Sequence, residues 1–374
     1  MIGRIVRASL APVVAVLLAL PAPALAEQNR DAPIKVIIDD EGFALMHLML
    51  LESDRVEVLG ITSVSGNVWA NRATAMALRG LEITGDTDVP VAEGATFPLI
   101  NSEALTERWE AIYGKLVWKG AWMKEWVEST QQSTPPYFGP GDPVDLPEGN
   151  PAITKSDEIA ANFLIRMVRE HPHQITIVAC GPLTNLALAQ RLDPEFASLV
   201  KELVYMGGSL APRQVLEGTS AEEFAREFVN TPRREFNARF DPEAASIVSR
   251  SPWARLTVVP TDPSTATQRS ADLLARMAAA AKPGVGEYIA AMEPGFPLWD
   301  EIVAGYLLDP SIVTRSDMLY VDYNTQFGAG YGDMLSWHEH YQPGLGERQA
   351  RVIEAIDPAR LEAVMVKAMA DGPD

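Results

Sequence analysis

Three neighbouring acids, Asp39, Asp40 and Glu41, form the first group in the chain whose side chains could do chemistry together. The β-branched residues before them predict a short buried strand at 34–38, and an apolar run after Gly42 predicts a helix. Three carboxylates packed this closely cannot all stay charged and unpaired at low cost. A bound hard cation such as Ca²⁺ or Mg²⁺, which prefers oxygen ligands, would resolve the conflict. The alternative is a solvated acidic turn that caps the N-terminus of the helix.

Polar or glycine-rich turns also follow three other predicted strands. These turns lie at 65–67, 180–182 and 206–208, and Asp300 adds a carboxylate at the start of a predicted helix. In a parallel sheet the carboxyl ends of all strands lie on one edge, and ligands bind outside that edge. We therefore expect these turns and the three acids to converge on one pocket.

The elements that must position these residues alternate between strand and helix. This order predicts a parallel sheet with right-handed crossovers, and therefore the α/β fold class. Further strands are predicted at 56–64, 87–91, 175–179, 202–206, 256–260, 320–323 and 351–356, and helices at about 70–81, 157–171, 270–281, 297–308 and 358–369. Another helix is predicted to open at 241–245, with Asp241 as its N-cap and Pro242 at its first position.

Residues 96–155 depart from this alternation and are predicted to form an insertion. Its first part is a helical piece rich in aromatic residues, and residues 133–151 are rich in proline and glycine. The tryptophans could simply cover an edge of the sheet. The alternative is a lid over the site, because aromatic faces stack well on flat ligands. The aromatic residues are Trp109, Tyr113, Trp118, Trp122 and Trp126.

Residues 1–26 have the pattern of a secretory signal peptide. Arg4 and Arg7 give a positive start, an apolar stretch follows, and residues 24–26 read Ala-Leu-Ala. The apolar stretch is too short to span a bilayer. We therefore expect a protein that is cleaved after Ala26 and exported, periplasmic or secreted, with no membrane association after cleavage.

The composition narrows the class of protein further. The formal net charge is −19, and loss of the two signal-peptide arginines makes the mature chain still more acidic. This acidity argues against nucleic acid or an anionic membrane as the partner of a general basic face. Cys180 is the only cysteine, so no intrachain disulfide can form and the fold must hold by its core. Residues 27–374 are expected to form a single domain that carries the insertion.

Several stretches, in the correct order, resemble the inosine–uridine-preferring nucleoside hydrolases. The resemblance is closest to exported members that carry a Trp-Asp pair near the C-terminus. Any one stretch is weak, but the ordered set is specific and covers nearly the whole mature chain. The stretches are Val-Ile-Ile-Asp at 36–39, Val-Leu-Gly-Ile-Thr-Ser-Val-Ser-Gly-Asn at 58–67, Asp-Val-Pro-Val-Ala-Glu-Gly at 88–94, Gly-Pro-Leu-Thr-Asn-Leu-Ala at 181–187, Met-Gly-Gly at 206–208, Glu-Phe-Asn at 235–237, Asp-Pro-Glu-Ala-Ala at 241–245 and Trp-Asp-Glu at 299–301.

The resemblance implies one open, mostly parallel doubly wound α/β sheet with helices on both faces. It also implies hydrolysis of the N-glycosidic bond of a ribonucleoside substrate to ribose and free base. In the family, Ca²⁺ binds the ribose 2′- and 3′-hydroxyls and the attacking water, and an aspartate takes the proton from that water. A cation lowers the pKa of its water and a carboxylate can remove the proton, so this chemistry suits the acids seen here. Because family members often form dimers or tetramers, a homodimer or homotetramer is implied as well.

Individual positions receive roles through the resemblance. Asp300 matches a Ca²⁺ ligand, and Cys180 stands where the family usually has a threonine whose backbone carbonyl binds calcium. Because only the carbonyl is needed, cysteine is acceptable there, and no base is evidently paired with the thiol to make it a nucleophile. The positions that match ribose or other substrate contacts are Asn67, Met206, Glu235, Asn237 and Trp299.

Trp299 is a departure from the family pattern. The family commonly has a histidine at this position that helps to protonate the leaving base, and tryptophan cannot deliver a proton at neutral pH. His338 and His340 are the possible substitutes. The other interpretation is that both are ordinary surface histidines.

The opening motif is the larger departure, because it is five residues shorter than the family's Asp-x-Asp-x-x-x-Asp-Asp. Asp39 matches the first aspartate, while Asp40 and Glu41 match the final pair, a ribose contact and a Ca²⁺ ligand. Asp39 or Asp40 would then act as the base, and Asp40, Glu41, Asp300 and the Cys180 carbonyl would hold Ca²⁺. Two alternatives stay open. One is a degenerate homologue that binds nucleosides or ribose without cleaving them. The other is a solute-binding protein, which would need two lobes and a hinge.

Overall fold

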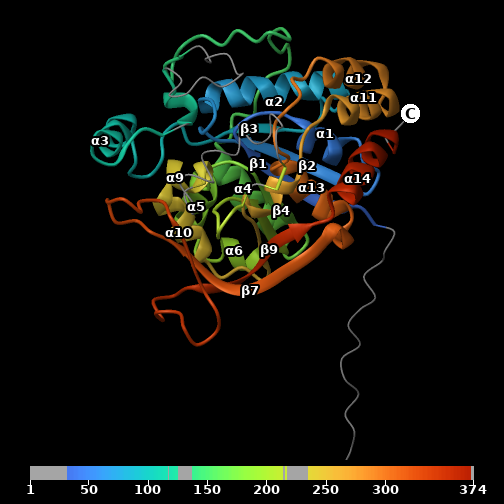
Figure 1. Cartoon of the computed structure of the whole chain (residues 1–374). Coiled ribbons are helices and arrows are strands. Elements are labelled where there is room, and N and C mark those ends of the chain that lie inside the picture. Colours follow the sequence, from blue (N-terminus) through green and yellow to red (C-terminus); the bar gives the residue numbers. More distant parts are fainter. Residues whose placement is uncertain (1–31, 117, 125–136, 214, 217–234, 372–374) are drawn as a thin grey trace, which may run out of the picture. The chain divides into compact units, whose positions relative to one another are not determined.

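The computed structural model describes most of the chain (Figure 1). The predicted signal peptide at 1–26 and Trp126 of the insertion lie outside the described residues. Within the described part of the chain, no helix is both long enough and apolar enough to span a bilayer. The described residues are 32–116, 118–124, 137–213, 215–216 and 235–371.

A nine-stranded sheet lies at the centre of the described residues, in the order β3-β2-β1-β4-β5-β6-β9-β7-β8. Neighbours from β3 to β9 run parallel, and β7 is antiparallel to both β9 and β8. The mostly parallel α/β sheet predicted from the sequence is therefore confirmed. The strands are β1 (Ile34–Asp40), β2 (Val56–Ser63), β3 (Val91–Glu93), β4 (Thr176–Ala179), β5 (Glu202–Met206), β6 (Leu256–Val259), β7 (Val313–Tyr323), β8 (Met334–Trp337) and β9 (Arg348–Ile356).

Strand β1 is longer than predicted, and this changes the interpretation of the acids. It includes Asp39 and Asp40, which lie opposite Thr62 and Ser63 of β2. Successive side chains of a strand point to opposite faces of the sheet. Two of the three acids therefore belong to the strand, and they face different layers of the fold.

Two other predicted strands are displaced. The strand predicted at 87–91 begins only at Val91, because residues 86–89 form a turn closed by a hydrogen bond from Val89 N to Asp86 O. The strand predicted at 320–323 is only the end of β7, which begins at Val313 and whose register with β9 shifts twice.

Helices cover both faces of the sheet, as a doubly wound fold requires (Figure 1). Val36 and Ile38 of β1 pack into one apolar cluster, whereas Ile37 packs into the other. The first cluster includes α1 (Leu45–Leu51), α2 (Ala70–Thr84), α11 (Ala271–Ala280), α12 (Pro283–Ala290), α13 (Asp300–Leu308) and α14 (Pro358–Ala370). The second includes α4 (Ala160–Glu170), α5 (Thr184–Leu192), α6 (Phe196–Leu199), α9 (Phe236–Phe240) and α10 (Pro242–Ser249).

Local chemistry sets several helix boundaries. Gly85 ends α2 with φ of 84°, a left-handed conformation that suits glycine. Asp241 caps α10 by accepting a hydrogen bond from Ala244 N at 3.0 Å, and Pro242 follows at the first helical position. This cap was predicted from the sequence and is confirmed.

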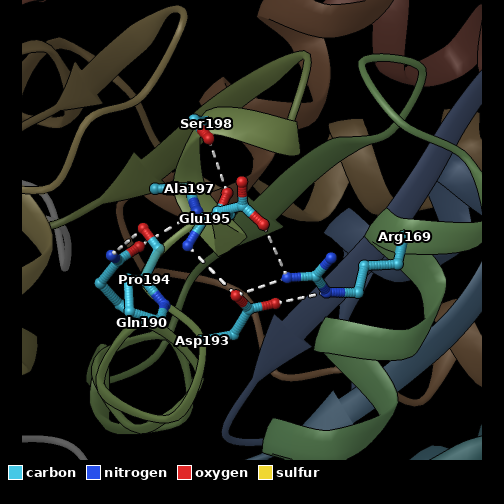
Figure 2. Close-up of polar contacts among 7 residues, drawn as sticks. All are labelled: Arg169, Gln190, Asp193, Pro194, Glu195, Ala197 and Ser198. Atoms are coloured by element: carbon cyan, nitrogen blue, oxygen red, sulfur yellow. Dashed lines mark hydrogen bonds and ion pairs between the residues drawn. The ribbon is translucent and has the colours of Figure 1, made fainter.

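Arg169 of α4 ties that helix to the connection between α5 and α6 (Figure 2). Its Nε and Nη2 donate to the two oxygens of Asp193 at 2.7 and 2.8 Å, and Nη2 also donates to Glu195. The Arg169 side chain holds the pKa of Asp193 below its usual range. A bidentate pair of this kind fixes orientation, so we assign the cluster a structural role.

The described part of the insertion contains α3 (Glu103–Tyr113) and the short 3₁₀ helix η1 (Gly120–Trp122). Trp122 stacks on Phe240 of α9 with ring centroids 4.2 Å apart, and Trp109 donates from Nε1 to Gly328 O. The insertion therefore packs against elements that lie far away in the sequence. The remaining 3₁₀ helices are η2 (Asp262–Ala266) and η3 (Pro310–Ile312).

Candidate active site

Asp39 is held on the face of the sheet that α5 covers. Its Oδ1 accepts hydrogen bonds from Thr62 Oγ1 at 2.5 Å and from Asn185 Nδ2 at 2.8 Å. Its Oδ2 is buried and has no hydrogen-bond partner among the described residues. Burial raises the pKa of Asp39 to about 7. Asn185 also donates to Ser63 O, so Asp39 is part of a network that joins β1, β2 and α5.

Asp40 faces the opposite layer, toward α1 and α13. Its Oδ1 accepts from Glu41 N at 2.7 Å, and its Oδ2 lies 3.5 Å from His47 Nε2 of α1. Burial, with the negative charges of Asp39 and Glu301 nearby, raises the pKa of Asp40 to about 7. Asp40 is therefore a buried carboxyl that ionises close to neutral pH.

Glu41 is clamped by the turn that follows β2. Asn67 donates to it twice, from its backbone N to Oε2 at 2.9 Å and from Nδ2 to Oε1 at 2.5 Å. Burial, and after it the negative charge of Asp40, raises the pKa of Glu41 well above its usual range. The amide oxygen of Asn67 in turn accepts from Trp118 Nε1 at 2.6 Å. The insertion thus reaches Glu41 through a single intermediate residue, Asn67.

Asp300 and Glu301 begin α13 and bring two more carboxyls to the site. Burial, followed by the charge of Asp40, raises the pKa of Asp300 well above its usual range, and the Cys180 thiol donates a hydrogen bond to Asp300. Burial also raises the pKa of Glu301, although Arg269 opposes this shift. Trp299 precedes the helix and packs, partly buried, against the larger apolar cluster.

Glu235 and Asn237 position the ends of three elements. Glu235 caps α9 by accepting from Asn237 N at 2.7 Å and Ala238 N at 3.0 Å, and it also accepts from Gly208 N. Burial nevertheless raises the pKa of Glu235 to about 7. Asn237 Nδ2 donates to the carbonyls that end β4 and β5, namely Cys180 O at 2.9 Å and Met206 O at 3.2 Å.

Five carboxyls, four of them buried and that of Asp300 partly buried, therefore act on one another electrostatically, and we refer to them as the acidic cluster. The cluster draws on the end of β1, the start of α9 and the start of α13. Asp39 lies beside it but on the other face. The members of the acidic cluster are Asp40, Glu41, Glu235, Asp300 and Glu301.

Three features of this site are not among the sequence predictions. Glu301 follows Asp300 directly, but a second acid in the first turn of a helix is also an ordinary cap. His47 lies in an apolar run and gives no periodic signal. The link from Trp118 to Asn67 joins residues 51 positions apart, so no local pattern contains it.

His338 and His340, which were the possible acids for the leaving base, are both exposed.

The chemistry of the acidic cluster fits a hard divalent cation. Its members offer carboxylate oxygens, and burial, followed by their mutual repulsion, raises the pKa values of Asp40, Glu41 and Asp300. A cation would relieve this repulsion. Within the residues that the structure describes, however, no three His, Cys, Asp or Glu side chains already converge closely enough to hold a metal ion.

An open α/β sheet with carboxyls and amides at its carboxyl edge is the arrangement in which doubly wound proteins bind their ligands. The family model for inosine-uridine preferring nucleoside hydrolases matches residues 36–363. This chain therefore belongs to the inosine-uridine preferring nucleoside hydrolase family, as its motifs imply.

Individual relatives agree with this assignment. Uridine nucleosidase 1 of Arabidopsis thaliana is 38% identical over 230 residues, which span 60% of this chain and 55% of the relative. Uncharacterized protein C800.11 of Schizosaccharomyces pombe is 28% identical over 338 residues, 86% of this chain and 80% of the relative. The match to the named nucleosidase thus covers only about half of that protein.

A solved structure supports the fold. The plant nucleoside hydrolase PpNRh1 superimposes with a TM-score of 0.65 at 23% identity, covering 90% of this chain and 99% of the plant enzyme. At this identity the likeness concerns the fold alone.

Proposed function

We propose that this protein hydrolyses the N-glycosidic bond of ribonucleosides to ribose and free base. The observation that carries the proposal is the acidic cluster, which lies beside the amides of Asn67 and Asn237 at the carboxyl edge of the sheet. Carboxylates and amides can bind sugar hydroxyls, and a carboxylate can also take a proton from water. Family membership is the reason for proposing the N-glycosidic bond as the bond that is cleaved.

Asp40 is the proposed base, in preference to Asp39. Oδ1 of Asp39 already accepts two hydrogen bonds on the α5 face, whereas Asp40 lies within the acidic cluster. A base works best when its pKa lies near the operating pH, and that of Asp40 is about 7. The water that attacks the sugar would lose its proton to a carboxylate oxygen of Asp40.

Asn67, Glu235 and Asn237 are proposed to orient the ribose. Each is already held by backbone or side-chain hydrogen bonds, so little freedom is lost when a sugar hydroxyl binds. Met206 ends β5 beside Asn237 and offers an apolar surface for the sugar. Trp299 can donate a hydrogen bond but cannot supply a proton to the leaving base.

Calcium is the proposed cofactor. Asp40, Glu41 and Asp300, with the backbone carbonyl of Cys180, would hold it. The bound ion would lower the pKa of the attacking water.

We also propose export through residues 1–26, which a comparison of the mature N-terminus with Glu27 would test.

A second candidate function is nucleoside binding without cleavage. The observation that favours it is that the acids are not yet gathered into a metal-holding group in the part of the chain that the structure describes. Asp40 is the last residue of β1, so the hydrogen bonds of the strand limit how far Asp40 and Glu41 can move.

One experiment separates the two functions. Purified protein, with and without Ca²⁺, is incubated with inosine, uridine or p-nitrophenyl riboside, and released reducing sugar is measured. Calorimetry in parallel reports binding of Ca²⁺ and of the nucleoside. We expect Ca²⁺-dependent sugar release that Asp40→Asn abolishes. Tight nucleoside binding with no sugar release would establish the second function, and absence of both would overturn the proposal.

A further inference from the structure

His47 is the one polar residue in helix α1, whose sequence is Leu-Met-His-Leu-Met-Leu-Leu. Its side chain is fully buried within the layer of helices that packs on β1. A buried imidazole costs free energy unless its nitrogens find partners, so its position requires an explanation. An apolar residue would fill this place in the core without that cost.

The hydrogen bond at Nδ1 determines which tautomer His47 adopts. Nδ1 accepts from Ala44 N at 3.2 Å, so its lone pair is occupied. The single ring proton is therefore on Nε2. With that proton in place, Nε2 cannot bind a metal and can only donate.

Asp40 places a carboxylate oxygen near that donor. His47 Nε2 lies 3.5 Å from Asp40 Oδ2, and Nε2 has no shorter hydrogen bond to any described residue. The separation is just beyond an ordinary hydrogen bond, and a small shift of the carboxyl would close it. The other oxygen of Asp40 already accepts from Glu41 N.

Packing fixes the direction of the imidazole. The ring of Phe43 stacks on it, with centroids 4.7 Å apart and planes at 26°. Phe43 is itself held against Gly80 of α2, where an added Cβ would lie 2.4 Å from the phenyl ring. Tyr288 of α12 packs edge-on against Phe43, with ring centroids 6.2 Å apart. This packing restrains the imidazole, whose Nε2 lies 3.5 Å from Asp40 Oδ2.

We propose that His47 is a positioning residue for Asp40, donating from Nε2–H to Oδ2 as substrate binds. This inference rests on the proposed function, in which Asp40 takes the proton from water. With Glu41 N on Oδ1 and His47 on Oδ2, each oxygen of the carboxylate has one fixed donor. The remaining lone pairs then point in defined directions, which is the condition for efficient proton transfer.

Two substitutions and a control test this role. His47→Leu removes the donor and keeps an apolar fill, so we expect kcat to fall about tenfold to a hundredfold, as when an outer-layer partner is lost. KM should stay within about threefold, because His47 does not touch substrate. His47→Gln keeps an N–H donor and should recover kcat to within about fivefold of the natural protein. Met49→Leu, equally buried on the same helix, should leave kcat unchanged.

The kinetic outcome decides the inference if the protein is active. A folded His47→Leu protein with kcat within about twofold of the natural protein would overturn the role. A His47→Gln protein that is as slow as His47→Leu would also overturn it, since a lost donor should be restored by another.

A spectroscopic measurement keeps the inference testable if no nucleoside is cleaved or if His47→Leu does not fold. In ¹⁵N NMR of the natural protein, His47 should show a proton on Nε2 and none on Nδ1. The Nε2–H resonance should shift when Asp40→Asn is introduced. A proton on Nδ1, or a resonance that ignores Asp40→Asn, would overturn the role of His47 without reference to catalysis.

Discussion

Gly66 lies against the carboxylate of Glu41 so closely that a Cβ on Gly66 would be 1.3 Å from Glu41 Oε2. Only glycine can occupy this position while Asn67 donates to Glu41 from its backbone N and from its side-chain Nδ2. The turn after β2 therefore positions Glu41, although the two residues belong to different strand ends.

Gly66→Ala should displace Glu41 and inactivate the protein. The added methyl overlaps the carboxylate, so the two hydrogen bonds from Asn67 cannot both persist. We expect sugar release from uridine or inosine to fall at least about a hundredfold, since a 1 Å misplacement alone can cost that much. Gly141→Ala is the matched control, because no atom lies within 4 Å of the added Cβ. Equal activities of the two variants would contradict this prediction.

Trp118→Phe should weaken substrate binding more than it slows turnover. It removes the donor that holds the amide oxygen of Asn67 and keeps an aromatic ring. One lost hydrogen bond corresponds to about a threefold to tenfold increase in KM. Trp253→Phe is the control, since Trp253 also donates its indole N–H, to Val248 O, at the opposite end of the strands. The prediction is wrong if both variants have the same KM.

Asp300→Asn should weaken Ca²⁺ binding by at least about tenfold in calorimetry. The amide keeps the shape of the side chain but removes a negative charge from the acidic cluster. The remaining carboxylates repel one another less, so binding of a cation relieves less repulsion. Asp272→Asn, an exposed acid in the first turn of α11, should bind Ca²⁺ as the natural protein does. Unchanged affinity in Asp300→Asn would remove that residue from the proposed metal site.

Cys180→Ser should retain activity within about threefold. The proposed role of Cys180 uses its backbone carbonyl, and serine can still donate to Asp300 from its side chain. Burial raises the pKa of the Cys180 thiol well above its usual range, so a thiol reagent should modify it only after unfolding. A hundredfold loss of activity in Cys180→Ser would instead indicate that the thiol takes part in the reaction.

Asp241 should make the protein less stable as pH rises from 4 to 6. Burial raises the pKa of Asp241 from 3.8 to about 6 in the folded protein. The folded state thus binds this proton more tightly than the unfolded state. Its contribution to the free energy of unfolding is full below about pH 4 and is lost as pH rises through about 6.

Asp241→Asn tests this sign, because asparagine also caps helices but does not ionise. In urea unfolding at pH 4, 5, 6 and 7, the free energy of unfolding should fall less for the variant than for the natural protein. Asp309→Asn is the control, because the hydrogen bond with Ser311 lowers the pKa of Asp309 below its usual value of 3.8. The contribution of Asp309 therefore changes only below about pH 4, and the profile of Asp309→Asn from pH 4 to 7 should run parallel to that of the natural protein. Parallel pH profiles for Asp241→Asn and the natural protein would contradict the assignment.

The order of strands and helices could be predicted from the sequence because each element carries its own local period. Buried parallel strands appear as short apolar runs, and the turns after them are polar or rich in glycine. The ordered motifs from Val36 to Glu301 also indicated the family, and the match across residues 36–363 confirms it. These signals depend on neighbouring residues, so no tertiary information is needed to find them.

Only the tertiary structure decided how the acids divide. Asp39 and Asp40 are adjacent and chemically alike, and the alternation of β1 sends one toward Asn185 and the other toward His47 and Glu301. Which face each acid takes depends on the register of β1 with β2, which is set by contacts across the sheet. The sequence by itself determined that acids and amides meet at one sheet edge. Their hydrogen bonds, and therefore their separate roles, come from partners that are far away along the chain.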